Sequence, residues 1–537
     1  MTCHTIRDLL LMAANLRPHQ EILRIKEDDL YQKLTCKELA ESVRELGNGL
    51  LRLGVKKGAK IGIMAENRQE WPIVYLAVTS IGAIITPISI LWEKPELEKL
   101  ANTGHLSFIF TSRIYLDKIT AIQPLVPSLQ QVICFDTLPT DAAQIPFSQI
   151  TESGQKSMRE GNDLFATLQV NSEDIAEILF VNCTLGVQLS HRAMLANVEG
   201  IYNALDINGA IGKKSLLLLP YSHLYPTVFG ILLPLLAPWT TITAATARMD
   251  HILRIIKETE PHYIFLVPLL LDRFYTRLSG RLKKGEKTLA TLGFEHVEWV
   301  FTAGAKCPKD LIVKVNELGL RVLEGYGVSE MAPFITMNTP AKFRPGSVGK
   351  PLPNVELMIQ YPDGAGNGEV TAQGPNMMTG YYNLAEANEA QKALGRTVID
   401  EKGWLHTGDI GRIDEDGFLH ITGRSRNILV SKGGTNIYPV EIEAALLKSP
   451  YIAGVMVVAR WDEINGEYPY AYIQAERKTT ATLSDEELHF HIQETLKGLT
   501  GQLAAYKIPR DFKMVSDISV YRREKEQKVM FTDLYQD

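Results

Sequence analysis

Apolar residues recur along the first hundred residues with two alternating periods. Residues 35–53 place apolar side chains on one helical face at three- to four-residue spacing, namely at Leu39, Val43, Leu46 and Leu50. Short apolar runs at 60–65 and 82–88 are typical of buried strands, and a second helical pattern covers 71–81 between them. Strand–helix–strand units of this kind predict a parallel sheet that helices cover on both faces.

The same alternation returns beyond residue 210. Strands are predicted at 215–219, 263–267, 297–301 and 320–324, and strand-like runs at 355–359 and 368–372 predict a small barrel-like subdomain. The segment from Leu216 to Ala245 is strongly apolar. Because four prolines interrupt it, we expect a strand, a loop and a buried helix there, and no membrane-spanning helix.

A compact α+β unit is predicted near the end of the chain. Its strands are expected at 418–421, 427–430, 455–459 and 470–474, with a helix at 439–447. The boundary is placed at 425–427, as a short hinge. The predicted fold is therefore α/β, with a large N-terminal domain (residues 1–425) and a small mobile α+β C-terminal domain (residues 426–537). The N-terminal domain is expected to combine parallel sheets, flanking helices and the barrel-like subdomain.

Composition narrows the class of protein. The 537 residues suffice for about three or four compact units. The net charge of −6, with no basic face or arm, argues against a nucleic-acid partner. Five scattered cysteines without metal spacing favour a reducing, cytoplasmic setting over disulfides or zinc. Residues 9–14 predict an amphipathic helix, and the N-terminus lacks the pattern of a signal peptide.

Several motifs carry residues suited to a nucleotide. Residues 404–411 are W-L-H-T-G-D-I-G, and a carboxylate such as Asp409 accepts two hydrogen bonds at once, which suits a ribose diol. Further motifs are L-E-G-Y-G-V-S-E at 323–330, T-A-G-A at 302–305, L-L-P-Y-S-H at 218–223, G-R-S-R-N at 423–427 and K-G-G at 432–434. Together, over residues 34–528, they resemble the adenylate-forming (AMP-binding) superfamily, in its acyl-CoA synthetase or long-chain fatty-acid–CoA ligase branch.

The resemblance implies a role for each matched residue. Asp409 would hold the ribose hydroxyls with Arg424 beside it, Tyr326 would stack on adenine, Ser329 would reach phosphate, and Glu330 would help to hold magnesium. A strand-to-helix turn that uses glycine for backbone freedom remains a structural explanation of the same segment. The nucleotide site implied by the family also includes Gly304, Ala305, Glu324, Gly325 and Gly327.

Two motifs concern the acyl group and CoA. The resemblance implies that His223 lines the carboxylate end of the acyl pocket, although a histidine among apolar residues is often a satisfied core residue. Gly433 would belong to a glycine loop that forms the pantetheine tunnel, or else to a plain hairpin turn. Arg426 takes the hinge position of a domain that rotates between two half-reactions.

Two segments depart from the family pattern. The family's phosphate loop, T-S-G-T-T-G-x-P-K-G, is about four residues shorter here, at 181–189, and contains no lysine. Backbone N–H groups and a cation are what stabilise a diphosphate leaving group, and Thr184 is the candidate that remains. Lys528 takes the place of the family's adenylation lysine, but the usual proline and glycine before it are missing, and a lysine in such a charged run is often simply solvated.

Both departures affect the adenylation step. We expect an ATP-dependent acyl-CoA synthetase-like protein that activates a fatty or similarly apolar acid as acyl-AMP and transfers it to CoA, with adenylation impaired. ATP or AMP, Mg²⁺ and CoA are the expected cofactors, and transient membrane contact stays open. The alternatives are a half enzyme that uses ready-made acyl-AMP and an inactive AMP- or acyl-binding protein. The catalytic candidates are Lys528, His223 and Glu330, the last also as metal ligand.

Overall fold

The computed structural model describes residues 3–27, 30–92, 94–136, 143–180, 186–205, 207, 211–244, 248–283, 288–305, 307–382, 398–424, 429–430, 436–437, 439–462, 466–500, 503 and 507–518. These residues form two compact units. The first comprises Met1–Leu357, Ala372–Leu384 and Asp414–His420, and the second comprises Met358–Thr371, Ala385–Ile413 and Ile421–Asp537. The predicted boundary at 425–427 lies outside the described residues and stays a prediction.

A nine-stranded sheet runs through the first unit in the order β16-β15-β14-β13-β12-β10-β11-β1-β2. The six strands from β14 to β1 in this order are parallel to one another, as the alternating pattern predicts, and the outer strands β15, β16 and β2 are antiparallel to their neighbours. Their bounds are β1 Glu21–Glu27, β2 Leu30–Thr35, β10 Lys214–Leu217, β11 Thr240–Ala244, β12 Tyr263–Leu266, β13 Trp299–Thr302, β14 Val322–Gly327, β15 Phe334–Met337 and β16 Lys350–Pro351.

An eight-stranded sheet, also in the first unit, has the order β19-β9-β8-β4-β3-β5-β6-β7. Its central strands are parallel, and β9 and β19 are antiparallel to their neighbours. Their bounds are β3 Lys60–Met64, β4 Ile84–Pro87, β5 Phe108–Thr111, β6 Gln131–Cys134, β7 Ile145–Pro146, β8 Ile175–Phe180, β9 Gly186–Ser190 and β19 Gly380–Tyr382.

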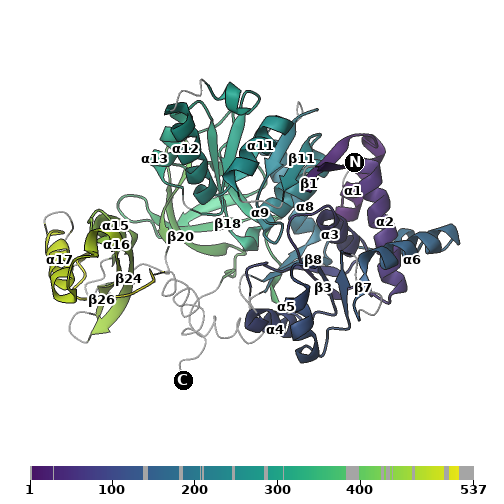
Figure 1. The fold of residues 1–537 in the computed structure, drawn as a ribbon, viewed down its shortest axis with the longest axis horizontal. Helices are drawn as coiled ribbons and strands as arrows, with labels where there is room; N and C mark the ends of the chain where they lie inside the picture. Colours follow the sequence, from purple (N-terminus) through teal and green to yellow (C-terminus); the bar gives the residue numbers. More distant parts are fainter. Residues whose placement is uncertain are drawn as a thin grey trace. The chain divides into compact units, whose positions relative to one another are not determined.

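Helices cover both sheets of the first unit, and Figure 1 shows α12 and α13 side by side. Every residue of α3 except the first is buried, which explains its uniformly apolar sequence. The bounds are α1 Ile6–Leu16, α2 Cys36–Arg52, α3 Glu70–Ser80, α4 Lys94–Thr103, α5 Leu116–Ile122, α6 Phe147–Arg159, α7 Leu164–Thr167, α8 His191–Leu205, α9 Leu224–Thr227, α10 Leu233–Leu236, α11 Met249–Thr259, α12 Pro268–Lys283 and α13 Lys309–Glu317, with short turns η1 Gln123–Leu125, η3 Val228–Leu232, η4 Ala290–Leu292 and η5 Ser329–Met331.

The apolar segment that begins at Leu216 folds as a strand, a short buried helical stretch and a second strand. The stretch passes from α9 through the π-helical turn η3 to α10, and β11 follows. No helix among the residues that the structure describes is long and apolar enough to cross a bilayer.

The two sheets of the first unit meet where their central strands end. Asn67, just after β3, donates a hydrogen bond from Nδ2 to the carbonyl of Leu219 (2.9 Å), and its Oδ1 accepts one from the backbone N–H of Tyr221 (3.1 Å). The rings of Trp71 and Tyr221 pack beside this contact, with centroids 5.5 Å apart. The segment after β10, which carries His223, is thereby fixed to the carboxyl end of β3.

Most of a four-stranded sheet, β17-β18-β20-β21, belongs to the second unit, together with a two-stranded and a three-stranded sheet. The bounds are β17 Glu356–Gln360, β18 Gly368–Gln373, β20 Leu405–Ile413, β21 Leu419–Arg424, β22 Leu429–Val430, β23 Asn436–Ile437, β24 Ile452–Asp462, β25 Gly466–Ala475 and β26 Phe512–Met514, with helices α15 Pro439–Leu446, α16 Arg477–Thr480 and α17 Asp485–Lys497. The α/β fold class with a small α+β C-terminal region is confirmed.

Candidate functional site

The candidate site of the first unit lies at the carboxyl edge of the nine-stranded sheet. Leu217, Phe265, Phe301 and Leu323 stand opposite one another on β10, β12, β13 and β14. Parallel strands in register end at the same edge, which is where open α/β sheets bind ligands. The segments that follow these strands, at 218–223, 267–268, 303–305 and 325–330, are therefore brought to one edge, as the motifs require.

Gly304 offers open backbone at this edge. Its φ is +84°, a conformation that residues with a side chain rarely adopt, and a β carbon there would have only Val267 within 4 Å, at 3.8 Å. Gly304 and Ala305 are exposed, whereas Ala303 is buried. A flat ligand can approach the main chain at Gly304 closely.

The glycines of the L-E-G-Y-G segment are needed for packing, and their part in the nucleotide site stays a prediction. A β carbon on Gly325 would lie 2.5 Å from the ring of Phe301, and one on Gly327 would lie 1.8 Å from the carbonyl oxygen of Pro333. These two glycines allow β14 and β15 to approach each other, so the structural explanation accounts for both.

Glu324 brings a buried carboxyl group to the edge. It is 7% exposed, its Oε2 has no hydrogen-bond partner within the described part of the chain, and burial raises its pKa to about 7. Thr302, its register partner on β13, is buried as well, and its Oγ1 also has no partner among the described residues. Burial and the nearby Glu324 raise the pKa of the Cys307 thiol to about 12, so that thiol stays protonated.

Glu330, in the turn η5, is half-buried and tied to a segment fifty residues away in sequence. Its Oε1 accepts a hydrogen bond from the hydroxyl of Tyr381 (2.7 Å), and its carbonyl accepts one from the backbone N–H of Met378 (2.8 Å). The amides of Asn197 and Asn376 both donate to the carbonyls of residues 331 and 334. The turn that carries Glu330 is thereby held from two sides.

Tyr381 belongs to β19, which pairs with β9, and β9 pairs with β8. Phe180 and Gly186 are the last paired residues of the β8–β9 hairpin, so five residues, 181–185, connect them. Residues 186–189, which the sequence placed in the loop, are strand: that part of the prediction was wrong. Thr184 lies outside the described residues.

His223 precedes α9 at the carboxyl edge. Its side chain is exposed to solvent, but the surrounding protein still lowers its pKa through desolvation. An accessible imidazole does not fit a satisfied core residue. The exposure argues against a core histidine, and the role of His223 at the acyl pocket stays a prediction.

The second unit positions Asp409 on β20. Its side chain is buried, at 3% exposure, and its backbone N–H donates to Oγ1 of Thr407 (3.1 Å). Beside it, Glu369 accepts hydrogen bonds from the backbone N–H of Gly408 (3.2 Å) and contacts Nδ1 of His406 (2.9 Å). The T-G-D part of β20 is therefore held by several hydrogen bonds.

Several predicted residues cannot be placed. Arg424 ends β21, but its side chain lies outside the described part of the chain, as do Gly433, Arg426 and Lys528. Their roles stay predictions. Tyr326 and Ser329 lie at the edge and are half-buried.

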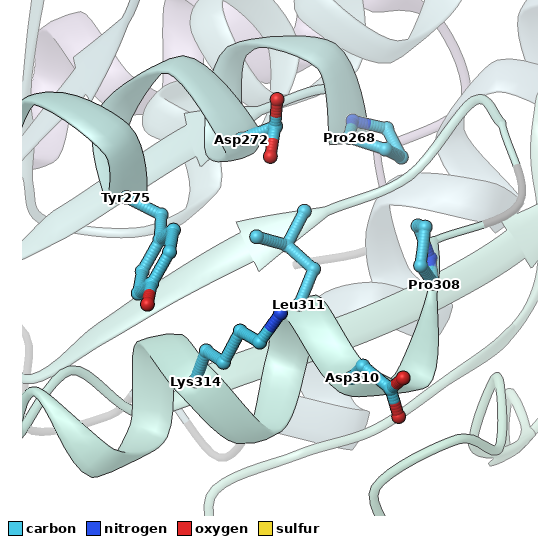
Figure 2. A pocket seen from close by; sticks show the side chains of 7 residues that line it. All are labelled: Pro268, Asp272, Tyr275, Pro308, Asp310, Leu311 and Lys314. Carbon is cyan, nitrogen blue, oxygen red and sulfur yellow. The ribbon is translucent and has the colours of Figure 1, made fainter. Parts of the chain in front are cut away.

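A surface pocket of about 380 Å³ lies between α12 and α13 and contains none of the candidate residues. Figure 2 shows Tyr275 and Asp272 of α12 facing Leu311 and Lys314 of α13, with Pro268 and Pro308 where the two helices begin.

No group of three or more His, Cys, Asp or Glu side chains suited to a metal ion occurs among the described residues. A magnesium site at Glu330 would therefore need oxygen ligands from phosphate as well.

Tyr381, Asn197 and Asn376 were missed by sequence reasoning. The G-Y-Y triplet at 380–382 was visible, but its partner could be found only by knowing that β19 pairs with β9. The two asparagines lie 179 positions apart yet meet at the same two carbonyls, which no local pattern indicates.

Comparisons with known proteins agree with this geometry. Residues 12–382 match the family described as AMP-binding enzyme, and residues 441–525 match the AMP-binding enzyme C-terminal domain. The medium-chain fatty-acid–CoA ligase of Escherichia coli (strain K12) is 25% identical over 503 residues, 90% of this chain and 83% of that protein. The 4-coumarate–CoA ligase CCL1 of Humulus lupulus is 26% identical over 481 residues, 86% of this chain and 83% of that protein.

Solved structures share the fold. ATP-bound MatB from Rhodopseudomonas palustris superposes with a TM-score of 0.74 at 23% identity, over 97% of this chain and 99% of that one. The O-succinylbenzoate CoA synthetase MenE of Bacillus subtilis, in complex with ATP and magnesium, gives 0.71 at 23% identity, over 95% of each chain. The chain therefore belongs to the AMP-binding enzyme family.

Proposed function

We propose that this protein is an ATP-dependent ligase that joins a fatty or similarly apolar carboxylic acid to CoA, with a weakened adenylation step. The acid would attack the α-phosphate of ATP, giving acyl-AMP and diphosphate. The thiol of CoA would then attack the acyl carbon and release AMP. The observation that carries this proposal is the assembly of residues 303–305, 324–330 and 218–223 at one sheet edge.

The residues at that edge suit a nucleotide. The open backbone at Gly304 accommodates a flat base, and Tyr326 would stack on it. The unpartnered Oε2 of Glu324 is a buried acceptor, or a donor when protonated, which fits a polar group of the ligand. In the second unit, Asp409 and Arg424 are proposed to hold the ribose.

Glu330 fits a magnesium ion bound together with phosphate oxygens. Its carboxylate accepts one hydrogen bond, from Tyr381, and a carboxylate has further lone pairs for a cation. Bound Mg²⁺ would neutralise charge on the phosphates. Ser329 is proposed to donate to phosphate, and Lys528 to contact the acid and the α-phosphate.

The apolar acid is supported by the surroundings of His223. The imidazole is followed by a segment, Leu224 to Leu235, in which every side chain is buried. Relatives that act on a medium-chain fatty acid and on 4-coumarate both use acids with an apolar body. His223 is proposed to face the carboxylate, and Gly433 to lie along the pantetheine of CoA.

The cysteines fit a reducing cytoplasm. Cys3, Cys36, Cys134 and Cys307 are free, and all but Cys3 are buried. We propose a cytoplasmic protein on that basis.

A half enzyme that uses ready-made acyl-AMP is the second candidate, followed by a binding protein without turnover. The five-residue connection between Phe180 and Gly186 is the observation that supports these two alternatives. Two measurements distinguish the ligase, the half enzyme and the binding protein. The first is calorimetry with ATP·Mg²⁺ and with AMP, and the second is diphosphate release with a long-chain acid. ATP-dependent release supports the ligase. AMP binding without release, together with thioester formation from acyl-AMP and CoA, supports the half enzyme. No nucleotide binding would overturn all enzymatic candidates.

A further inference from the structure

A short segment, residues 376–382, connects the turn of Glu330 with the hairpin of the phosphate loop. At one end, Asn376 binds the carbonyls of residues 331 and 334 (2.7 and 3.0 Å), and Met378 binds the carbonyl of Glu330. At the other end, the backbone N–H of Thr379 donates to the carbonyl of Gln188 (3.0 Å), and β19 pairs along β9.

Tyr381 lies in the middle of this segment and contacts Glu330 through its side chain. The residue is 8% exposed, and its hydroxyl donates to Oε1 of Glu330 over 2.7 Å. Its backbone stands opposite Val187 on β9, which stands opposite Leu179 on β8. One residue therefore touches the Glu330 carboxylate and forms part of the sheet that carries residues 181–185.

A hydrogen bond from a buried hydroxyl restricts a carboxylate in two ways. It fixes the rotamer of the glutamate, and it occupies one lone pair, which leaves the other oxygen for a further partner. Hydrogen bonds to a charged acceptor are among the stronger ones in proteins. An unrestrained glutamate side chain would lose more conformational freedom on binding a cation.

We infer that Tyr381 is a positioning residue: its hydroxyl orients the Glu330 carboxylate toward the metal–phosphate group and couples that orientation to the β8–β9 hairpin. This inference rests on the proposed function, because it assumes that Glu330 binds the metal of a metal–nucleotide complex.

The test compares Tyr381→Phe with Tyr382→Phe in the full-length protein. Tyr382 lies on the same strand, and its side chain points to the opposite face of the sheet. Its ring packs edge-on against the ring of Phe180, with the two centroids 6.5 Å apart. Each variant loses one hydroxyl and keeps its ring. The melting temperature of each is compared with wild type to confirm folding.

Calorimetry with ATP·Mg²⁺ and with AMP in the absence of divalent cations gives the readout. We expect Tyr381→Phe to bind ATP·Mg²⁺ about tenfold more weakly, the size of one charge-assisted hydrogen bond. Its affinity for metal-free AMP should equal that of wild type, and Tyr382→Phe should match wild type for both ligands. If Tyr381 had a purely structural role, Tyr381→Phe would bind both ATP·Mg²⁺ and AMP more weakly.

Three results would overturn the inference, and they differ in what else they reject. Unchanged ATP·Mg²⁺ affinity in Tyr381→Phe rejects the positioning role and leaves the ligase proposal intact. Failure of the wild-type protein to bind ATP·Mg²⁺ rejects both. Equal loss of ATP·Mg²⁺ and AMP affinity in Tyr381→Phe also overturns the inference, because it would show damage to the fold of the edge.

Discussion

Thr302 and Glu324 stand in register on the parallel strands β13 and β14, and each has a buried side-chain oxygen without a hydrogen-bond partner among the described residues. Buried polar atoms are almost always paired, and leaving one unpaired costs roughly 1–3 kcal/mol. Two such atoms on neighbouring strands at the carboxyl edge indicate that the free energy of unfolding is lower than it would be with both atoms paired. A ligand that pairs with them would recover it.

Replacing Glu324 with glutamine should make stability less dependent on pH. The folded protein keeps a proton on Glu324 up to a pKa of about 7, whereas an unfolded chain releases it near 4.5. The folded state therefore binds more protons between these values, so wild-type stability falls as pH rises through this window and then levels off. The free energy of unfolding of the variant does not fall in this way, and the wild-type fall amounts to at most about 3 kcal/mol. Urea denaturation at pH 4.5 and pH 8 measures it.

Glu295→Gln is the matched control, because Glu295 is exposed on the same unit. The stability difference between this variant and wild type should not change with pH. If Glu324→Gln behaves in the same way, burial does not hold the Glu324 proton.

Alanine substitutions at Gly304 and Gly327 should separate ligand contact from packing. At Gly327 the new β carbon would lie 1.8 Å from a carbonyl oxygen, so β14 and β15 must move apart, at roughly 2–4 kcal/mol. At Gly304 the space is open, and the left-handed backbone conformation costs only about 1–2 kcal/mol. AMP affinity measured on the folded protein should fall for Gly304→Ala. A larger stability loss at Gly304 than at Gly327 would contradict this assignment.

Substituting Asp409 with asparagine should weaken AMP binding. The buried carboxylate would lose its charge, and with it about 10–100-fold in affinity, the range of a hydrogen bond to a charged acceptor. Calorimetry on the folded variant measures this. Glu415→Gln, in the exposed turn that follows β20, should bind AMP as wild type does. Equal affinities for both variants would remove Asp409 from the ribose site.

Lengthening the phosphate loop should raise adenylation. Replacing residues 181–185 with a loop that carries T-S-G-T-T-G-x-P-K should increase ATP-dependent diphosphate release by roughly 10²–10³-fold, the effect of restoring one electrostatic contact to the leaving group. The control is the same insertion with alanine in place of its lysine, which restores length without charge. No increase from either insertion would mean that another step limits the protein.

The repeating strands and helices were predictable because their signal is local. Residues 60–65, 71–81 and 82–88 fold as β3, α3 and β4 within two residues of the predicted limits. Strand β9 was missed because its five residues begin with glycine and become a strand only through pairing with β8 on one side and β19 on the other. The motif residues at the carboxyl edge were chosen from the resemblance, and their roles stay predictions. The hydrogen bond of Tyr381 to Glu330 could not be predicted, because it depends on the pairing of two strands, β9 and β19, that lie about 200 positions apart in the sequence.

The β8–β9 hairpin is paired on both sides, which bears on how long its connection can be. Both of its strands are held by neighbours, β4 on one side and β19 on the other, so the hairpin does not depend on its connection for stability. Closing a longer connection is inexpensive, about 0.6 kcal/mol for each doubling of length. Folding therefore places almost no selection on the length of residues 181–185.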